Sequence, residues 1–319
     1  MSDPELSVVL VNHNGADCLP QALRALARNT AAEAVEGIVV DSASEDGSWK
    51  DVEQHWAKVR AVRLDENVGF TGGCNRGAAE ARGRLVAFVN FDGEVEAAWD
   101  EPLRELLDDP SVSVATGLLL KPDGRTIEAA GVEIAPNFAT YGRQEGEPRG
   151  AVPTEPVDVA AASGALMMLR RDEFLSLGGF YEPIFMYGEE ADYCLRVPGR
   201  VVLDARSAIR HAYGTASGPR RSHFRLYWGS RNRLVNSVRH LERGALARSV
   251  LASAGFDVMA VLETRDLGAA RAIARGWRDG LRAMRRERAA RTPSERREAA
   301  RRLSSLREAI VEHRRLGRA

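Results

Sequence analysis

The chain has 319 residues, of which 44% are hydrophobic, and its 45 Lys and Arg residues balance 45 Asp and Glu residues, so the formal net charge is zero. This balance gives no reason to expect nucleic acid or another polyanion as a partner. The length predicts one compact domain of about 200–250 residues with an appendage. Three scattered cysteines without C-x-x-C spacing exclude a disulfide framework and fit a reducing cytosol.

The first hundred residues alternate between strand and helix patterns. Short apolar runs predict four strands, at 6–11, 37–41, 59–64 and 85–89. Leu19, Leu23 and Leu26 have helical spacing, and a glycine-rich turn at 69–77 is expected to lead into a helix through Glu80. This alternation favours βαβ units and a mostly parallel sheet, in which ligands bind beyond the carboxyl ends of the strands. Polar clusters follow three of these strands, at 12–15, 41–46 and 90–94.

The middle of the chain is more mixed, and its last third is helical. Further strands are expected at 112–120 and 201–203, and 157–169 is apolar with a break at Ser163-Gly164. Residues 136–156 are rich in Gly, Pro, Glu and Arg and predict a loop that could cover a site. After Trp228 the pattern is helical, and Thr292-Pro-Ser-Glu295 is a capping box that starts a helix.

Three side chains near predicted strand ends could carry chemistry. Asp41 could accept hydrogen bonds from a nucleoside, although the Asp41–Asp46 loop could equally cap a helix. Asp92 could hold Mg²⁺ or Mn²⁺, or could simply belong to an Asp-Gly turn. His211 could share that ion, because imidazole suits Mn²⁺, whereas a lone histidine is more often structural.

The segment 185–196 gathers three carboxylates, Glu189, Glu190 and Asp192, among apolar and aromatic residues. Such a grouping is costly unless a proton, a cation or a basic partner compensates it. On a helix, Glu189 and Asp192 would share one face while Glu190 points elsewhere, so the carboxylates could have different roles. The alternative is an exposed acidic helix start, since acidic residues favour the first turn.

In this order, these motifs resemble family 2 of the inverting GT-A glycosyltransferases, especially its rhamnosyltransferase-like and galactofuranosyltransferase-like members. The resemblance covers roughly residues 5–240. The segments that carry it are 7–14, 41–48, 66–77, 89–92, 163–171, 178–180, 185–196, His211 and 227–233. It implies a GT-A fold, with a Rossmann-like, mostly parallel sheet flanked by helices and a C-terminal helical extension. It also implies a nucleotide-diphosphosugar donor, with a dTDP- or UDP-sugar expected, and an acceptor hydroxyl on a glycan, a lipid-linked molecule or a small molecule.

The resemblance also assigns residues. Glu190 matches the catalytic base, with Glu189 and Asp192 as neighbours, and Asp92 with His211 matches the site of a divalent metal, Mn²⁺ or Mg²⁺. The positions expected to bind the nucleotide-sugar are Asn12, Asn14, Asp41, Ser44, Asn67, Gly69, Gly72, Asn75, Asn90 and Arg231. Two positions depart from the family pattern. Asn90 replaces the first acid of the D-x-D motif, and glutamate replaces aspartate at the base position, which leaves Glu189 as a rival for that role.

We therefore expect a glycosyltransferase domain at 1–238, with a nucleotide-binding half at 1–120 and an acceptor-side half at 121–238. An arginine-rich helical extension would follow at 239–319. That extension could contact anionic lipid, form a homodimer interface or remain exposed to solvent. The N-terminus lacks a signal-peptide pattern and no apolar run approaches about 20 residues. We therefore expect a cytoplasmic protein without a spanning helix, either free or peripheral at the inner face of the membrane. The alternative function is an inactive relative that only binds nucleotide-sugar or glycan.

Overall fold

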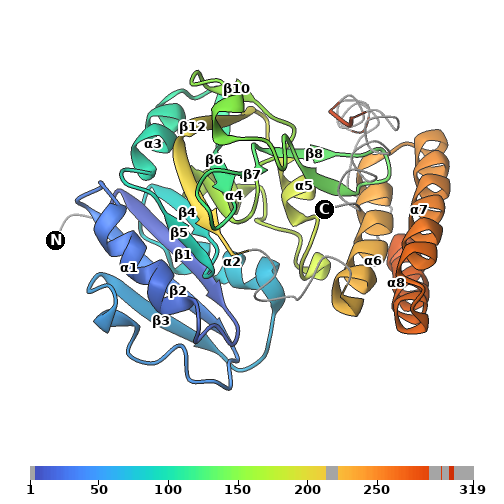
Figure 1. The fold of residues 1–319 in the computed structure, drawn as a ribbon, viewed down its shortest axis with the longest axis horizontal. Coiled ribbons are helices and arrows are strands. Elements are labelled where there is room, and N and C mark those ends of the chain that lie inside the picture. The colour runs from blue at the N-terminus through green and yellow to red at the C-terminus, as the bar shows by residue number, and fades with distance from the viewer. Residues whose placement is uncertain (1–3, 213–221, 287–295, 297–301, 305–319) are drawn as a thin grey trace.

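The structure is a computed structural model that describes residues 4–212, 222–286, 296 and 302–304. A ten-stranded mixed sheet forms its centre, in the order β10-β12-β6-β11-β4-β1-β2-β3, with β5 paired to β12 and β7 paired to β6 (Figure 1). Strands β8 (Val132–Ile134) and β9 (Thr140–Gly142) form a separate hairpin. Helices flank the sheet, which confirms the predicted fold class.

The N-terminal half is built from parallel strands joined by helices. The strands are β1 (Leu6–Asn12), β2 (Val35–Ser42), β3 (Val59–Leu64) and β4 (Leu85–Val89). β1 pairs in parallel with both β2 and β4, and β2 pairs in parallel with β3. The carboxyl ends of all four strands therefore lie at the same edge of the sheet.

Helices cover both faces of this sheet, as expected for strands that are apolar throughout. α1 (Leu19–Asn29) and α3 (Asp100–Asp108) bury their leucines and Trp99 against one face. α2 (Gly69–Glu80), α4 (Arg171–Ser176) and α5 (Glu189–Cys194) pack on the other face. Gly73 and Gly77 of α2 lie against Val11 and Val9 of β1, where an added Cβ would meet valine methyl groups at 2.5 and 2.2 Å. The glycines therefore allow α2 to pack closely on the sheet.

The strands that follow β4 complete the sheet with antiparallel and parallel pairings. They are β5 (Gly93–Val95), β6 (Val112–Leu120), β7 (Ile127–Ala129), β10 (Val157–Asp158), β11 (Leu166–Arg170) and β12 (Arg200–His211). β12 is nine residues longer than the strand expected at 201–203. It extends to His211 because its later residues pair with both β6 and β5. That extension brings His211 beside Gly93, close to the end of β4.

Three long helices, α6 (His223–His240), α7 (Arg243–Thr264) and α8 (Leu267–Arg286), stand together at the end of the molecule away from β3 (Figure 1). The predicted domain boundary at 238 falls inside α6, which contacts α7, α8 and the loop before α5. The predicted capping box at 292–295 lies outside the described residues.

The expectation that no helix is long and apolar enough to cross a membrane is wrong for α7. By length and composition α7 meets that criterion, with a mean hydropathy of 1.5 over an 18-residue window. Interspersed Ala, Gly and Ser residues hide this window from a search for unbroken apolar runs.

Candidate active site

A cavity of about 700 Å³ opens at the carboxyl edge of the parallel strands. Its size is typical of a site for a small organic ligand. Its walls come from the loops after β1, β2 and β4, from the β8–β9 hairpin and from the segment before α5. Asn67, Gly69, Asn90 and Asp92, all predicted site residues, line it.

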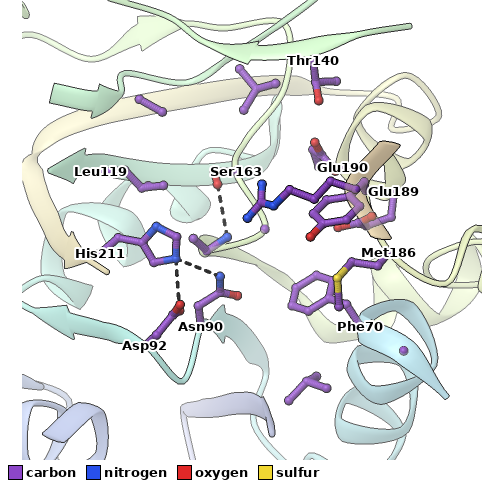
Figure 2. A pocket seen from close by; sticks show the side chains of 18 of the residues that line it. Phe70, Asn90, Asp92, Leu119, Thr140, Ser163, Met186, Glu189, Glu190 and His211 are labelled. Carbon is purple, nitrogen blue, oxygen red and sulfur yellow. Dashed lines mark hydrogen bonds and ion pairs between the residues drawn. The ribbon is translucent and has the colours of Figure 1, made fainter. Parts of the chain in front are cut away.

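One side of the cavity carries a compact group around His211 (Figure 2). Nε2 of His211 lies 3.1 Å from Oδ1 of Asp92 and 3.2 Å from Nδ2 of Asn90. Nδ1 of the same ring lies 2.9 Å from Oε1 of Glu128. The structure thus brings together the three residues predicted at this position and adds a fourth, Glu128, which is on β7.

The chemistry of this group fits a divalent cation. Mg²⁺ and related ions are usually bound by one or two carboxylates, water and substrate phosphates, and imidazole also suits Mn²⁺. Asp92 and Nε2 of His211 would provide two ligands, and Glu128 would orient the imidazole through Nδ1. Among the described residues no group of three or more His, Cys, Asp or Glu could hold a metal by itself. The remaining ligands would therefore come from phosphate oxygens and water.

Charge on His211 depends on these carboxylates. Burial disfavours the imidazolium, but hydrogen bonds to Asp92 and Glu128 and their negative charges outweigh it and raise the pKa of His211 to about 10. Asp92 and Glu128 thus favour the protonated imidazole, and a cation bound at Nε2 would have to displace that proton.

The opposite side of the cavity carries Glu189 and Glu190 (Figure 2). Both begin α5, immediately after Phe185, Tyr187 and Gly188, which have positive φ angles of 65°, 72° and 90°. This tight turn directs both side chains to the cavity. The expectation that Glu190 points away from the face shared by Glu189 and Asp192 is therefore wrong, because Glu189 and Glu190 both line the cavity and Asp192 does not.

The two glutamates have different surroundings. Burial and the charge of Glu190 raise the pKa of Glu189 well above its usual value. Oε2 of Glu189 is buried and has no hydrogen-bond partner among the described residues. Burial also raises the pKa of Glu190, but the backbone N–H groups of Glu190 and Gly188 and the Thr140 hydroxyl offset part of that effect. The pair therefore holds a proton on Glu189 more readily than on Glu190.

Asp192, the third carboxylate of this segment, does not line the cavity. Its side chain is fully buried and accepts hydrogen bonds from Nε of Arg196 (3.0 Å), Nε of Arg239 (2.7 Å) and Nε2 of His240 (2.8 Å). Burial opposes its ionisation, yet these cations hold the pKa of Asp192 far below its usual range. The structure therefore corrects the catalytic assignment of Asp192: it is an ion-pair centre that joins α5 to α6.

Asp41 is also fully buried and does not line the cavity. It accepts hydrogen bonds from Nδ2 of Asn12 (2.7 Å), Oγ of Ser44 (2.5 Å) and Nη1 of Arg63 (2.7 Å). Asn14 continues this network, because its backbone N–H donates to Ser44 and its Oδ1 accepts from Glu45. The buried Asp41, Asn12 and Ser44 therefore join the loops after β1 and β2, and their predicted nucleotide contact does not fit this burial, whereas Asn14 is exposed and its predicted role stays a prediction.

Three other positions predicted to bind the nucleotide-sugar, Gly72, Asn75 and Arg231, contact neighbouring residues of the protein. Gly72 packs against Val68, and Asn75 bonds to both the N–H and the carbonyl of Phe180. Nη1 of Arg231 donates to Oδ1 of Asn232 (2.6 Å), while its guanidinium stacks on Trp228. None of these three positions lines the cavity.

Asn232, in the segment 227–233, holds the turn before α5, a role that the sequence does not reveal. Its Nδ2 donates to the carbonyl oxygens of Ile184 (2.9 Å), Met186 (2.8 Å) and Tyr187 (3.0 Å). These carbonyls belong to the turn that delivers Glu189 and Glu190. Asn232, to which Arg231 donates, therefore holds this turn in place from outside the cavity.

Sequence reasoning missed several cavity residues. His13, Ser42, Glu128, Thr140, Ser163, Phe185, Tyr187 and Arg225 all line the cavity. For Glu128 a signal existed, because the turn Lys121-Pro-Asp-Gly124 predicts a hairpin that returns along the strand at 112–120.

Comparisons with known proteins agree with this architecture. Sequence similarity extends to the O-antigen biosynthesis protein RfbC of Myxococcus xanthus, 27% identical over 226 residues, which is 65% of this chain and 17% of that protein. The chain spans 17% to 37% of the length of the first curated relatives it matches.

Two solved structures share the fold. TarS 1-349 of S. aureus in complex with UDP-GlcNAc has a TM-score of 0.57 and 16% identity, over 88% of this chain and 81% of that one. The mannosyltransferase PcManGT of Pyrobaculum calidifontis, in complex with GDP-Man and Mn²⁺, has a TM-score of 0.53 and 18% identity, over 92% and 78%. The family model described as glycosyl transferase family 2 matches residues 7–174, more than half of the sequence. The chain belongs to glycosyl transferase family 2.

Proposed function

We propose that the protein transfers a sugar, with inversion, from a nucleotide-diphosphosugar to an acceptor hydroxyl. The donor would be a UDP- or dTDP-sugar carrying a hexose or a deoxysugar such as rhamnose. The observation that carries the proposal is the arrangement of the cavity, with Asp92 and His211 on one side facing two glutamates across it. UDP-GlcNAc and GDP-Man in the structures with the same fold support this class of donor.

The donor would lie along the strand edge. Its diphosphate would meet the Asp92–His211 side, and the ion bound there would neutralise the negative charge that develops on the leaving nucleoside diphosphate. Asn90 would add an amide contact at the same place, 3.2 Å from His211. Loops braced by Asp41 would bring His13 and Ser42, which line the cavity, to the nucleoside.

Glu190 would act as the base. The acceptor hydroxyl attacks the anomeric carbon opposite to the diphosphate, and a carboxylate on that side takes its proton, a contribution of typically about 10²–10⁴-fold. Glu190 is suited to this task because its Oε2 accepts the Gly188 N–H (3.1 Å) and because the pKa of Glu189 is raised further than that of Glu190, which places a shared proton on Glu189. Glu189, protonated and therefore neutral, would then help to hold the side chain of Glu190 in position.

The proposal is tested by calorimetry and thermal shift with a panel of UDP-, dTDP- and GDP-sugars, with and without Mn²⁺. We expect one donor to bind with Mn²⁺ and to be hydrolysed slowly to nucleoside diphosphate. Asp92→Ala should remove the metal-dependent part of both signals, whereas Asp123→Ala, on an exposed turn, should not. No binding by any nucleotide-sugar contradicts the proposal, and binding without release of nucleoside diphosphate, even after acceptors are added, favours the inactive relative.

A further inference from the structure

The outer surface of α7 and α8 collects most of the exposed apolar side chains of the molecule. Seven large apolar side chains are exposed among the described residues, and five of them belong to these helices: Leu251, Val258, Leu262, Leu267 and Leu281. Leu251, Leu262 and Leu267 are 72%, 67% and 75% exposed. The spacing of Leu251, Val258 and Leu262 places them on one face of α7. Exposed apolar surface gathered in this way marks an interaction site.

The inner face of α7 is polar, which reverses the usual pattern of a helix on a soluble core. Ser249 and Asp257 are buried, and Oγ of Ser249 lies 2.7 Å from Oγ of Ser237 on α6. Asp257 pairs with Arg233 and accepts from Nε1 of Trp277 (2.7 Å) on α8. Only 22% of the apolar window of α7 is buried. The apolar side chains of α7 therefore contribute little to the core of this chain.

These polar contacts also determine whether α7 could cross a membrane or only lie on its surface. Crossing the bilayer would separate Asp257 from Arg233 and expose buried charges to hydrocarbon, which is strongly unfavourable. α7 therefore stays packed on α6, and only its outer face is available. A helix held in this way lies on a membrane surface rather than through it.

Positive charge lies on α8 among its exposed apolar residues Leu267 and Leu281. α8 contains six arginines and one aspartate, and Arg271, Arg278 and Arg282 are exposed with the spacing of one helix face. In a two-fold dimer through this surface, the arginine rows of the two copies would be brought together, which is unfavourable. Lipid phosphates would instead pair with them. The charge thus favours an anionic bilayer over a second copy as the occupant.

The described residues after α8, which are 296 and 302–304, contact parts of the protein other than the outer surface of α7 and α8. Arg296 donates to the carbonyl oxygens of Val238 and Leu241, and the backbone N–H of Ser304 donates to Ile134 of β8. These contacts lie at the end of α6 and on the β8–β9 hairpin. They leave the exposed side chains of α7 and α8 available to a partner.

We propose that the outer face of α7 and α8 docks on a membrane surface that contains anionic lipid. Leu251, Val258 and Leu262 would enter the boundary between headgroups and acyl chains, while the α8 arginines pair with lipid phosphates. This inference does not depend on the proposed function. If this inference and the proposed function both hold, α6 connects the docking surface to the candidate active site. Phe224 and Arg225, near the start of α6, line the cavity, so docking would keep the cavity close to a lipid-linked acceptor.

Vesicle flotation of the full chain tests the proposal. The protein should float with vesicles of phosphatidylcholine and phosphatidylglycerol, but not with phosphatidylcholine alone, and salt should weaken the binding. Leu251→Gln/Val258→Gln/Leu262→Gln and, separately, Arg271→Gln/Arg278→Gln/Arg282→Gln should each reduce partition by about tenfold or more. All six side chains are exposed, so both variants should keep the wild-type melting temperature.

Matched controls change the same residue types elsewhere. Leu175→Gln on α4 and Arg76→Gln on α2 alter exposed side chains far from α7 in sequence and should leave partition unchanged. A wild-type chain that ignores anionic vesicles overturns the proposal, as do triple variants that float like wild type. A dimer seen by light scattering, abolished by the leucine variant and without vesicle binding, assigns the surface to a second copy instead.

Discussion

The side chains of His211 and Glu128 meet at a hydrogen bond of 2.9 Å between Nδ1 and Oε1, so that Nε2 of the same ring faces Asp92. They come from β12 and β7, which pair with opposite sides of β6. A carboxylate in this position fixes both the orientation and the tautomer of the histidine. Metal affinity should therefore depend on Glu128, although it is not itself one of the proposed ligands.

Glu128→Ala should weaken Mn²⁺ binding by about 10–100-fold, a loss typical of residues that orient a metal ligand. Titration calorimetry or electron paramagnetic resonance with Mn²⁺ and nucleoside diphosphate measures this directly. Glu128→Gln keeps an oxygen acceptor for Nδ1 and should recover part of the affinity. Glu94→Gln, on neighbouring β5, removes the same charge from an exposed position and should have little effect. Unchanged affinity in Glu128→Ala would remove Glu128 from the metal site.

The proton held by Glu189 should appear in the pH dependence of turnover. A base must be deprotonated, so the rate should fall as the pH drops through the pKa of Glu190, which burial raises above its usual value. Protonated Glu189 favours the ionised form of Glu190. Glu189→Ala should therefore raise the pKa of Glu190 and move the acid limb to higher pH, while Glu189→Gln, which keeps a donor, should move it less. The pH profile of kcat measures both, and an acid limb unaffected by either change contradicts this coupling.

Asp192→Asn should reduce the free energy of unfolding by about 3–5 kcal/mol, because it leaves buried cations without their counterion. Urea unfolding measures the loss, and Asp172→Asn, whose side chain is 96% exposed, should change stability by less than about 0.5 kcal/mol. The pKa of Asp192 is depressed in the folded state, so its contribution is complete above the ordinary aspartate pKa. It should be lost as the pH falls below about 4. A wild-type unfolding curve for Asp192→Asn would show that the ion pairs contribute nothing.

Asn232→Ala should lower kcat more than donor affinity. The three carbonyl contacts of Asn232 hold the turn with positive φ angles before Glu189, and a small displacement of that turn misplaces the base by a distance that can reduce the rate about 10²-fold. Asn236→Ala removes a single contact, to the Gly188 carbonyl, and should cost less. Discontinuous activity assays, run below the melting temperature of each variant, compare kcat and donor affinity in Asn232→Ala and Asn236→Ala. An equal loss of donor affinity would place Asn232 in nucleotide binding instead.

Local patterns in the sequence predict the strands well, because buried parallel strands are continuous apolar runs with polar ends. β3, β4 and β6 have the predicted bounds, and the placement of Asp92 and Asn90 at the carboxyl edge follows from β4. His211 is close to Asp92 only because β12 continues beyond Leu203 and pairs with β5. That pairing depends on residues distant in the sequence, which a local pattern does not reveal.

Side-chain direction is the part that sequence periodicity predicts wrongly. Asp192 looked like a member of the catalytic cluster, but its partners, Arg239 and His240, lie more than forty residues later, on α6. Asp41 follows β2 as predicted, but Asn12, Ser44 and Arg63 surround its carboxylate. In both cases local partners, Arg196 and Ser44, are joined by partners distant in the sequence that only the folded chain brings near the carboxylate.

Glu190→Gln tests the central claim most directly, with Glu189→Gln as its matched comparison. The measurement is the rate of nucleoside diphosphate release from the donor that binds, in the presence of Mn²⁺, together with the donor dissociation constant. We predict that Glu190→Gln lowers the rate by about 10²-fold or more and leaves donor binding unchanged, while Glu189→Gln retains most of the rate. Wild-type turnover in Glu190→Gln would contradict the account and move the base to Glu189 or to another residue of the cavity.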